Sequence, residues 1–136
     1  MIQLEEKKRD LIQNTLVQGT QQIFDTLETT TQLKGNLRNG GWSNKNNLFC
    51  AYLTYSPNDD PAEESVDVTF DLNIRDRVAQ LSVDMSWSNG VIIAEIFEQE
   101  VLYDNIENLL SKIDTIMSRL IVELPKEIKQ ALEKIA

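Results

Sequence analysis

The stretch VAQLSVDMSWSNGVIIAEIFE, residues 78–98, decides the fold. Apolar and polar side chains alternate through 78–87, which is the period-two pattern of a half-buried strand. Asn89-Gly90 favours a two-residue hairpin turn, so 91–98 returns as the next strand. The register set by this turn brings apolar residues together on one face. Its apolar pairs are Trp87 with Ile92, Met85 with Ala94, and Val83 with Ile96.

The strand pattern continues upstream of this hairpin. Residues 65–74 alternate between apolar and polar without a break, and 48–55 are rich in aromatic and aliphatic side chains. Together these segments predict a four-stranded antiparallel meander with one buried face. Residues 34–47 contain three glycines and five asparagines, so we expect a loop there. Trp42 lies among the basic residues of this segment. Its side chain is either an anchor for a partner or, as we favour, packed back on the core.

Helical periodicity flanks the strands on both sides. Residues 2–29 carry an apolar stripe and predict a long helix. A second stripe predicts a helix over 101–123, which Pro125 ends, and a short helix over 126–135 follows. The chain is therefore predicted to be one α+β domain over 1–136: a long helix, the meander, then a long and a short helix.

The composition removes most kinds of catalytic site. There is no histidine and only one cysteine, Cys50, which excludes histidine-based catalysis, thiolate metal sites and an internal disulfide. Cys50 lies on a predicted strand, where it is expected to be a buried small side chain. We predict a non-enzymatic protein without cofactor or metal, although magnesium bound by Asp and Glu alone stays open.

The expected location is the cytoplasm. The N-terminal residues lack the apolar run of a signal peptide, and no stretch approaches the roughly 18 apolar residues of a membrane span. A single cysteine also suits a reducing compartment. We therefore expect no membrane association.

The negative charge is concentrated in the middle of the chain. The net charge is −9, and residues 48–100 carry two basic and eleven acidic side chains. Such a segment repels a nucleic-acid backbone, so we expect no nucleic-acid binding. A protein partner with a basic surface is the expected counterpart.

The polar face of the predicted sheet is the first candidate site. The hairpin register puts Asp84 directly opposite Glu95, and at least one of the two should titrate above its usual pKa. Like charges in this position destabilise a sheet, which suggests a basic partner or a divalent cation; the alternative is a solvated face in an acidic protein. The predicted partner-binding residues are Asp67, Asp71, Asp84, Ile93, Glu95 and Phe97. Apolar members of this set indicate a protein-binding surface unless a loop or helix covers them.

Two further hypotheses concern the helices. A sheet wrapped on long helices can enclose a small apolar ligand, and this alternative pocket would be lined by Phe70, Met85, Trp87 and Ile113. A helix over 2–29 would span about 42 Å, whereas strands of eight to ten residues span roughly 26–34 Å. The helices are therefore expected to overhang the sheet, and a second copy of the chain is the predicted cover. We expect a homodimer.

Overall fold

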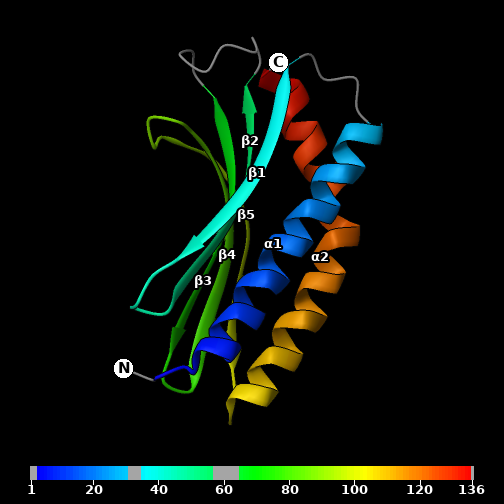
Figure 1. Cartoon of the computed structure of the whole chain (residues 1–136). Coiled ribbons are helices and arrows are strands. Elements are labelled where there is room, and N and C mark those ends of the chain that lie inside the picture. The colour runs from blue at the N-terminus through cyan, green and yellow to red at the C-terminus, as the bar shows by residue number, and fades with distance from the viewer. Residues whose placement is uncertain (1–2, 31–34, 57–64, 136) are drawn as a thin grey trace.

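Two helices pack on one face of a five-stranded antiparallel sheet (Figure 1). The computed structural model describes residues 3–30, 35–56 and 65–135. The elements are α1 (Glu6–Thr30), β1 (Asn36–Ser43), β2 (Leu48–Ser56), β3 (Val66–Arg75), β4 (Val78–Trp87), β5 (Ile92–Leu102) and α2 (Ile106–Ile135). Neighbouring strands in the sheet are neighbours in the chain, so the topology is a plain meander. The predicted α+β class is confirmed, with one more strand and one fewer helix.

The alternation read from the sequence places the core between sheet and helices. Every second residue of β3 is buried, from Val66 to Ile74, and β4 repeats the pattern from Ala79 to Met85. The helices lie side by side, with α1 over β1 and β2 and α2 over β5 (Figure 1). Their apolar stripes cover these strands, which removes both surfaces from water.

The expected loop over 34–47 is wrong for 36–43, which form the edge strand β1. This strand pairs with β2 from Asn36 opposite Ser56 to Ser43 opposite Phe49. Its glycines permit close approach of other groups. The Tyr52 side chain occupies the space where a Cβ of Gly40 would lie, and the Cys50 carbonyl occupies that of Gly41. Tertiary contact thus overrides the poor strand propensity of glycine and asparagine.

The asparagines that suggested a loop build the turn between β1 and β2. The Asn44 side chain accepts a hydrogen bond of 2.9 Å from the amide of Asn46. Asn47 adopts a positive φ of 61°, a conformation that asparagine tolerates better than most residues. Arg9 of α1 donates to the Asn47 side chain at 2.7 Å and to the Asn44 carbonyl. The start of α1 therefore holds this turn in place.

The C-terminal prediction of two helices over 101–123 and 126–135 is also wrong. Residues 92–102 form β5, and one continuous helix, α2, contains Pro125. Proline costs a helix one hydrogen bond and crowds the preceding turn. Leu124, Ile128 and Leu132 are buried on either side of it. Their packing holds the helix together across the proline.

Two β-bulges change the predicted register of β4 and β5. The Trp87 amide donates to the Val91 carbonyl at 2.9 Å, so the loop has three residues, with Gly90 at a φ of 91°. The pairs of Asp84 with Glu95 and of Met85 with Ala94 are confirmed, and bulges flank them. The other predicted pairs are wrong. Ile92 lies opposite Ser86 rather than Trp87, and Val83 lies opposite Phe97 rather than Ile96.

Both helices are longer than the strands they cover. The 25 residues of α1 span about 37 Å, whereas β1 and β2 beneath it, with 8 and 9 residues, span roughly 26 and 30 Å. The 30 residues of α2 span about 45 Å, against roughly 36 Å for the 11-residue β5. These lengths agree with the expected overhang, and the homodimer stays a prediction. No helix in the described part of the chain has both the length and the apolar character to cross a membrane.

Candidate functional site

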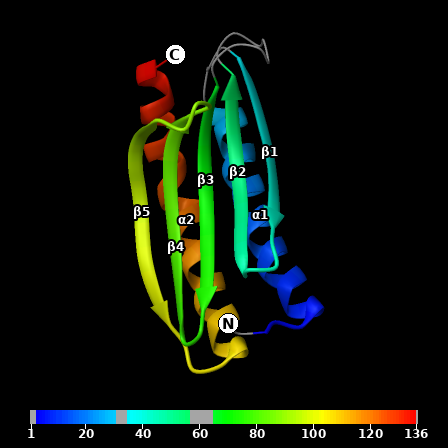
Figure 2. The same ribbon diagram turned by 90° about the vertical axis from the view of Figure 1, so that its left-hand side faces the viewer.

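The sheet face opposite the helices is open to solvent (Figure 2). Strand registers arrange its side chains in rows that run across the strands from β1 to β5. Two adjacent rows carry most of the acidic groups. One contains Trp42, Cys50, Asp71, Ser82 and Glu98, and the other Gly40, Tyr52, Thr69, Asp84 and Glu95.

A hollow of about 460 Å³ lies on this open face, and we call it the acidic groove. Its lining residues are Trp42, Leu48, Asp71, Asn73, Gln80, Ser82, Asp84, Glu95 and Glu98. Four of the nine are carboxylates and none is basic. The groove therefore presents negative charge with apolar surface at its β1 and β2 end, where Trp42 is 46% exposed.

Three of the predicted partner-binding residues come together in the acidic groove. They are Asp71, Asp84 and Glu95. Asp67 lies on the same face but outside the groove, and its carboxylate accepts a hydrogen bond of 2.7 Å from the Thr54 hydroxyl. The structure thus separates Asp67 from the other acids and gives it a partner of its own.

The two apolar members of the predicted set turn away from the open face. Phe97 lies opposite Val83, on the side of the helices, and the Arg119 guanidinium of α2 lies 5.6 Å from the centre of its ring. Ile93 is half-buried and packs against the core. Their predicted place beside Glu95 is therefore wrong. One bulge shifts every residue from Phe97 onward by one position, which moves Phe97 to the other face, and Ile93 is the extra residue of the second bulge.

Glu98 and Trp42 also belong to the groove. The sequence interpretation missed Glu98 and named Trp42 as a possible partner anchor. A two-residue turn without bulges would have put Glu98 opposite Leu81 in the core. The structure instead pairs Glu98 with Ser82 on the open face. The cost of burying an unpaired carboxylate was the signal that could have revealed a bulge in this strand. The favoured expectation that Trp42 packs back on the core is wrong, because Trp42 lies on the open face of β1 and is 46% exposed.

Burial, and then the charge of neighbouring carboxylates, raises the pKa of two carboxyl groups in the groove. The pKa of Asp84 is raised by burial first and then by the charge of Glu98. That of Asp71 is raised by burial and by the charge of Asp84, while a hydrogen bond from the Cys50 thiol opposes the rise. The raised pKa expected for one member of the pair of Asp84 and Glu95 is found at Asp84, but burial and then the charge of Glu98 cause it, rather than the charge of Glu95.

Cys50 has no reactive character in this setting. Its side chain is 2% exposed, and burial together with the charge of Asp71 raises the pKa of the thiol to about 12. A thiol with so high a pKa stays protonated at neutral pH, and only the thiolate is a nucleophile. Cys50 is therefore a structural residue that donates to Asp71.

The carboxylates of the groove do not converge on one point. Among residues 3–30, 35–56 and 65–135, no three His, Cys, Asp or Glu side chains are grouped closely enough to hold a metal ion. The acids are instead spread over β3, β4 and β5. This spacing suits several cationic side chains of a macromolecule better than one bound ion.

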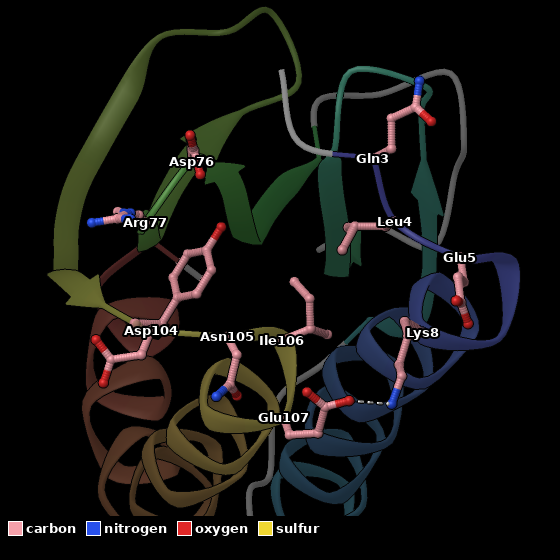
Figure 3. Close-up of a pocket in the computed structure, with 11 residues that line it drawn as sticks. Gln3, Leu4, Glu5, Lys8, Asp76, Arg77, Asp104, Asn105, Ile106 and Glu107 are labelled. Atoms are coloured by element: carbon pink, nitrogen blue, oxygen red, sulfur yellow. Dashed lines mark hydrogen bonds and ion pairs between the residues drawn. The ribbon is translucent and has the colours of Figure 1, made fainter.

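A second hollow, of about 480 Å³, lies at the end of the sheet where α2 begins (Figure 3). It is bounded by residues 3–5, by the turn between β3 and β4, and by residues 103–107. Lys8 and Glu107 form an ion pair of 3.1 Å across its rim. Side chains of both charges surround this hollow, including Arg77 and Asp76, so it favours neither a cationic nor an anionic ligand.

The residues of the alternative ligand pocket lie in the packed core. Phe70, Met85 and Ile113 are at most 1% exposed, and Trp87 is half-buried against the same cluster. A third hollow of about 490 Å³ lies between β5 and α2. None of the three hollows described here is lined by any of these four residues.

Comparison of the chain with known protein families, with curated proteins and with solved structures gave no match. The geometry of the open face therefore carries the functional argument alone.

Proposed function

We propose that this chain is a non-enzymatic, cytoplasmic protein-binding module whose acidic groove binds a partner with a basic surface. The main support for this proposal is the lining of the acidic groove, which contains four carboxylates and no basic side chain. The groove lies on a sheet face that neither helix covers (Figure 2). An acidic adaptor, a chaperone for one client, or an inhibitor of a basic protein would each use such a face.

Burial of the groove carboxylates, together with the repulsion between them, supports a cationic partner. Because the pKa values of Asp71 and Asp84 are raised, ionising both at neutral pH costs free energy in the isolated chain. A lysine or arginine side chain placed between them removes that cost and adds charge-assisted hydrogen bonds. Trp42 and Leu48 supply the apolar contact that protein interfaces combine with polar groups.

Affinity capture with two matched variants tests this function. The chain is immobilised as wild type, as Asp84→Asn/Glu95→Gln, and as Asp114→Asn/Glu127→Gln, and incubated with extract of its native cell at low and moderate salt. Both variants remove two negative charges, but Asp114 and Glu127 lie exposed on α2. We expect a basic protein that wild type and the α2 variant retain, that the groove variant loses, and that salt releases. Equal retention by both variants would contradict the proposal.

A further inference from the structure

The sheet has two edges, and the outer edge of β1 is free in the part of the chain that the structure describes. The Asn44 amide donates to the Leu48 carbonyl at 3.0 Å. Asn44 and Leu48 are therefore a hydrogen-bonded pair. Hydrogen-bonded and non-bonded pairs alternate along an antiparallel ladder without bulges, so this one bond shows which backbone groups of β1 point to β2. The backbone groups of 36, 38, 40 and 42 therefore point to β2. Those of Leu37, Asn39, Gly41 and Ser43 point outward.

The opposite edge, β5, is protected against strand pairing. Two β-bulges interrupt its ladder with β4, and the Lys112 ammonium donates to the Leu102 carbonyl at 2.6 Å. Three glutamates, at 95, 98 and 100, would also repel a second β5. Bulges and charges are the usual means by which an edge strand avoids pairing. β1 has an uninterrupted register, no acidic residue and Arg38 as its single charge.

The sequence of β1 is complementary to itself about Gly40. An antiparallel copy centred there places Leu37 opposite Ser43 and Asn39 opposite Gly41, which are the residues with outward backbone groups. Arg38 then lies opposite Trp42 on the open face, and twofold symmetry repeats this contact. Both side chains are exposed, and a guanidinium over an indole is a favourable cation–π pair. Gly40 has no side chain to obstruct the symmetry axis.

We propose that a second copy of the chain docks on β1 in this register and joins the two sheets into one. The four carboxylates of each acidic groove lie on β3, β4 and β5, away from the junction, whereas Trp42 at the end of the groove lies on β1. Five strand spacings of about 4.8 Å separate the two β3 strands, so the nearest carboxylates are roughly 24 Å apart, well beyond the Debye length of about 8 Å at physiological salt. Their charges therefore do not oppose the dimer, and both grooves open on the same face.

Sedimentation equilibrium over a dilution series tests the docking with a charge-matched pair of variants. Arg38→Glu places a carboxylate over Trp42 of the other copy, whereas Lys45→Glu makes the same change in charge in the turn beyond β1. We expect wild type and Lys45→Glu to dimerise at micromolar concentration, and Arg38→Glu to dimerise at least about tenfold more weakly, since two cation–π contacts are lost. A monomer at every concentration, or equal dimerisation of both variants, would overturn the proposal.

Residue-resolved amide hydrogen exchange identifies the surface. In the monomer the amides of Leu37, Asn39, Gly41 and Ser43 exchange quickly, while those of 38, 40 and 42 are protected by β2. Raising the concentration should slow exchange at the four outward amides alone. A dimer that protects β5 or the helices instead would overturn the proposed register. Neither measurement needs a ligand in the acidic groove, and its four carboxylates lie away from the junction, so failure here leaves the proposed function to its own test.

Discussion

Asp84 lies directly opposite Glu95 on the open face of the sheet. A β-bulge on each side confines the predicted two-residue register to this pair and to Met85 with Ala94. The neighbouring row adds Asp71 and Glu98 to the same groove. Cys50 donates a hydrogen bond to Asp71 and Gln80 donates one to Glu98, but no basic side chain lines the groove, so the repulsion among its carboxylates is relieved only in part.

Replacing Asp84 with asparagine should stabilise the free protein at neutral pH. The folded-state pKa of Asp84 is raised, so its favourable contribution is complete below the unfolded pKa of about 3.9 and is lost as pH rises through the folded pKa. Asp84→Asn removes this loss. We expect a gain of some tenths of a kcal/mol at pH 7, the size of one cross-strand pair, which disappears near pH 4. Urea unfolding at the two pH values measures it.

Asp67→Asn is the matched control for this prediction. Asp67 lies on the same face and carries the same charge, but it accepts a hydrogen bond from Thr54 and lies outside the groove. Its replacement should therefore bring no gain at pH 7. A lower stability of Asp84→Asn than of wild type would show that the Asp84 carboxylate makes a favourable contact.

The Cys50 thiol should resist alkylation in the folded protein. Its pKa of about 12 leaves almost no thiolate at neutral pH, and the surrounding side chains block access. The rate of reaction with iodoacetamide should rise by orders of magnitude when urea unfolds the chain. A rate in the native state close to that of the unfolded chain would mean that the strand around Cys50 opens readily.

The strands β3 and β4 were predictable because each has one face toward solvent and one buried face. Period-two alternation in the sequence reflects that difference directly. β1 was not predictable in this way. Neither of its faces is strongly apolar, and it pairs because Gly41 lets α1 and β2 approach it. Pro125 led to the wrong prediction of a helix end for a related reason. The buried contacts that hold α2 together across the proline come from other elements.

The candidate site was predictable where pairing is local. Asp84 with Glu95 follows from a short hairpin, and Asp71 follows from the tight turn between β3 and β4. Phe97 and Glu98 exchanged faces because a bulge adds one residue to a strand. Hydrophobicity alone does not locate such a residue when the sequence around it, from 91 to 97, is apolar almost throughout.

Truncating Phe70 should cost far more stability than truncating Trp87. Phe70 is completely buried at the centre of β3, so Phe70→Ala leaves a cavity and should cost about 3–5 kcal/mol. Trp87 is half-buried at the end of β4, where the structure can relax around a smaller side chain. Its replacement should cost clearly less than that of Phe70. Equal losses in chemical denaturation would mean that Trp87 belongs to the packed centre.

The two glycines of β1 should respond differently to a methyl group. A Cβ at Gly41 would lie 2.7 Å from the Cys50 carbonyl oxygen and from side-chain atoms of Gln13 and Val17 on α1. The β2 backbone and α1 cannot both move away from the added methyl group. Gly41→Ala should therefore lower the free energy of unfolding by about 1–3 kcal/mol, as overpacking does. At Gly40 the obstacle is the end of the Tyr52 side chain, which can swing into solvent from the open face. Gly40→Ala should therefore cost less in the same unfolding measurement, and the reverse order would show that α1 does not press on β1 as the structure has it.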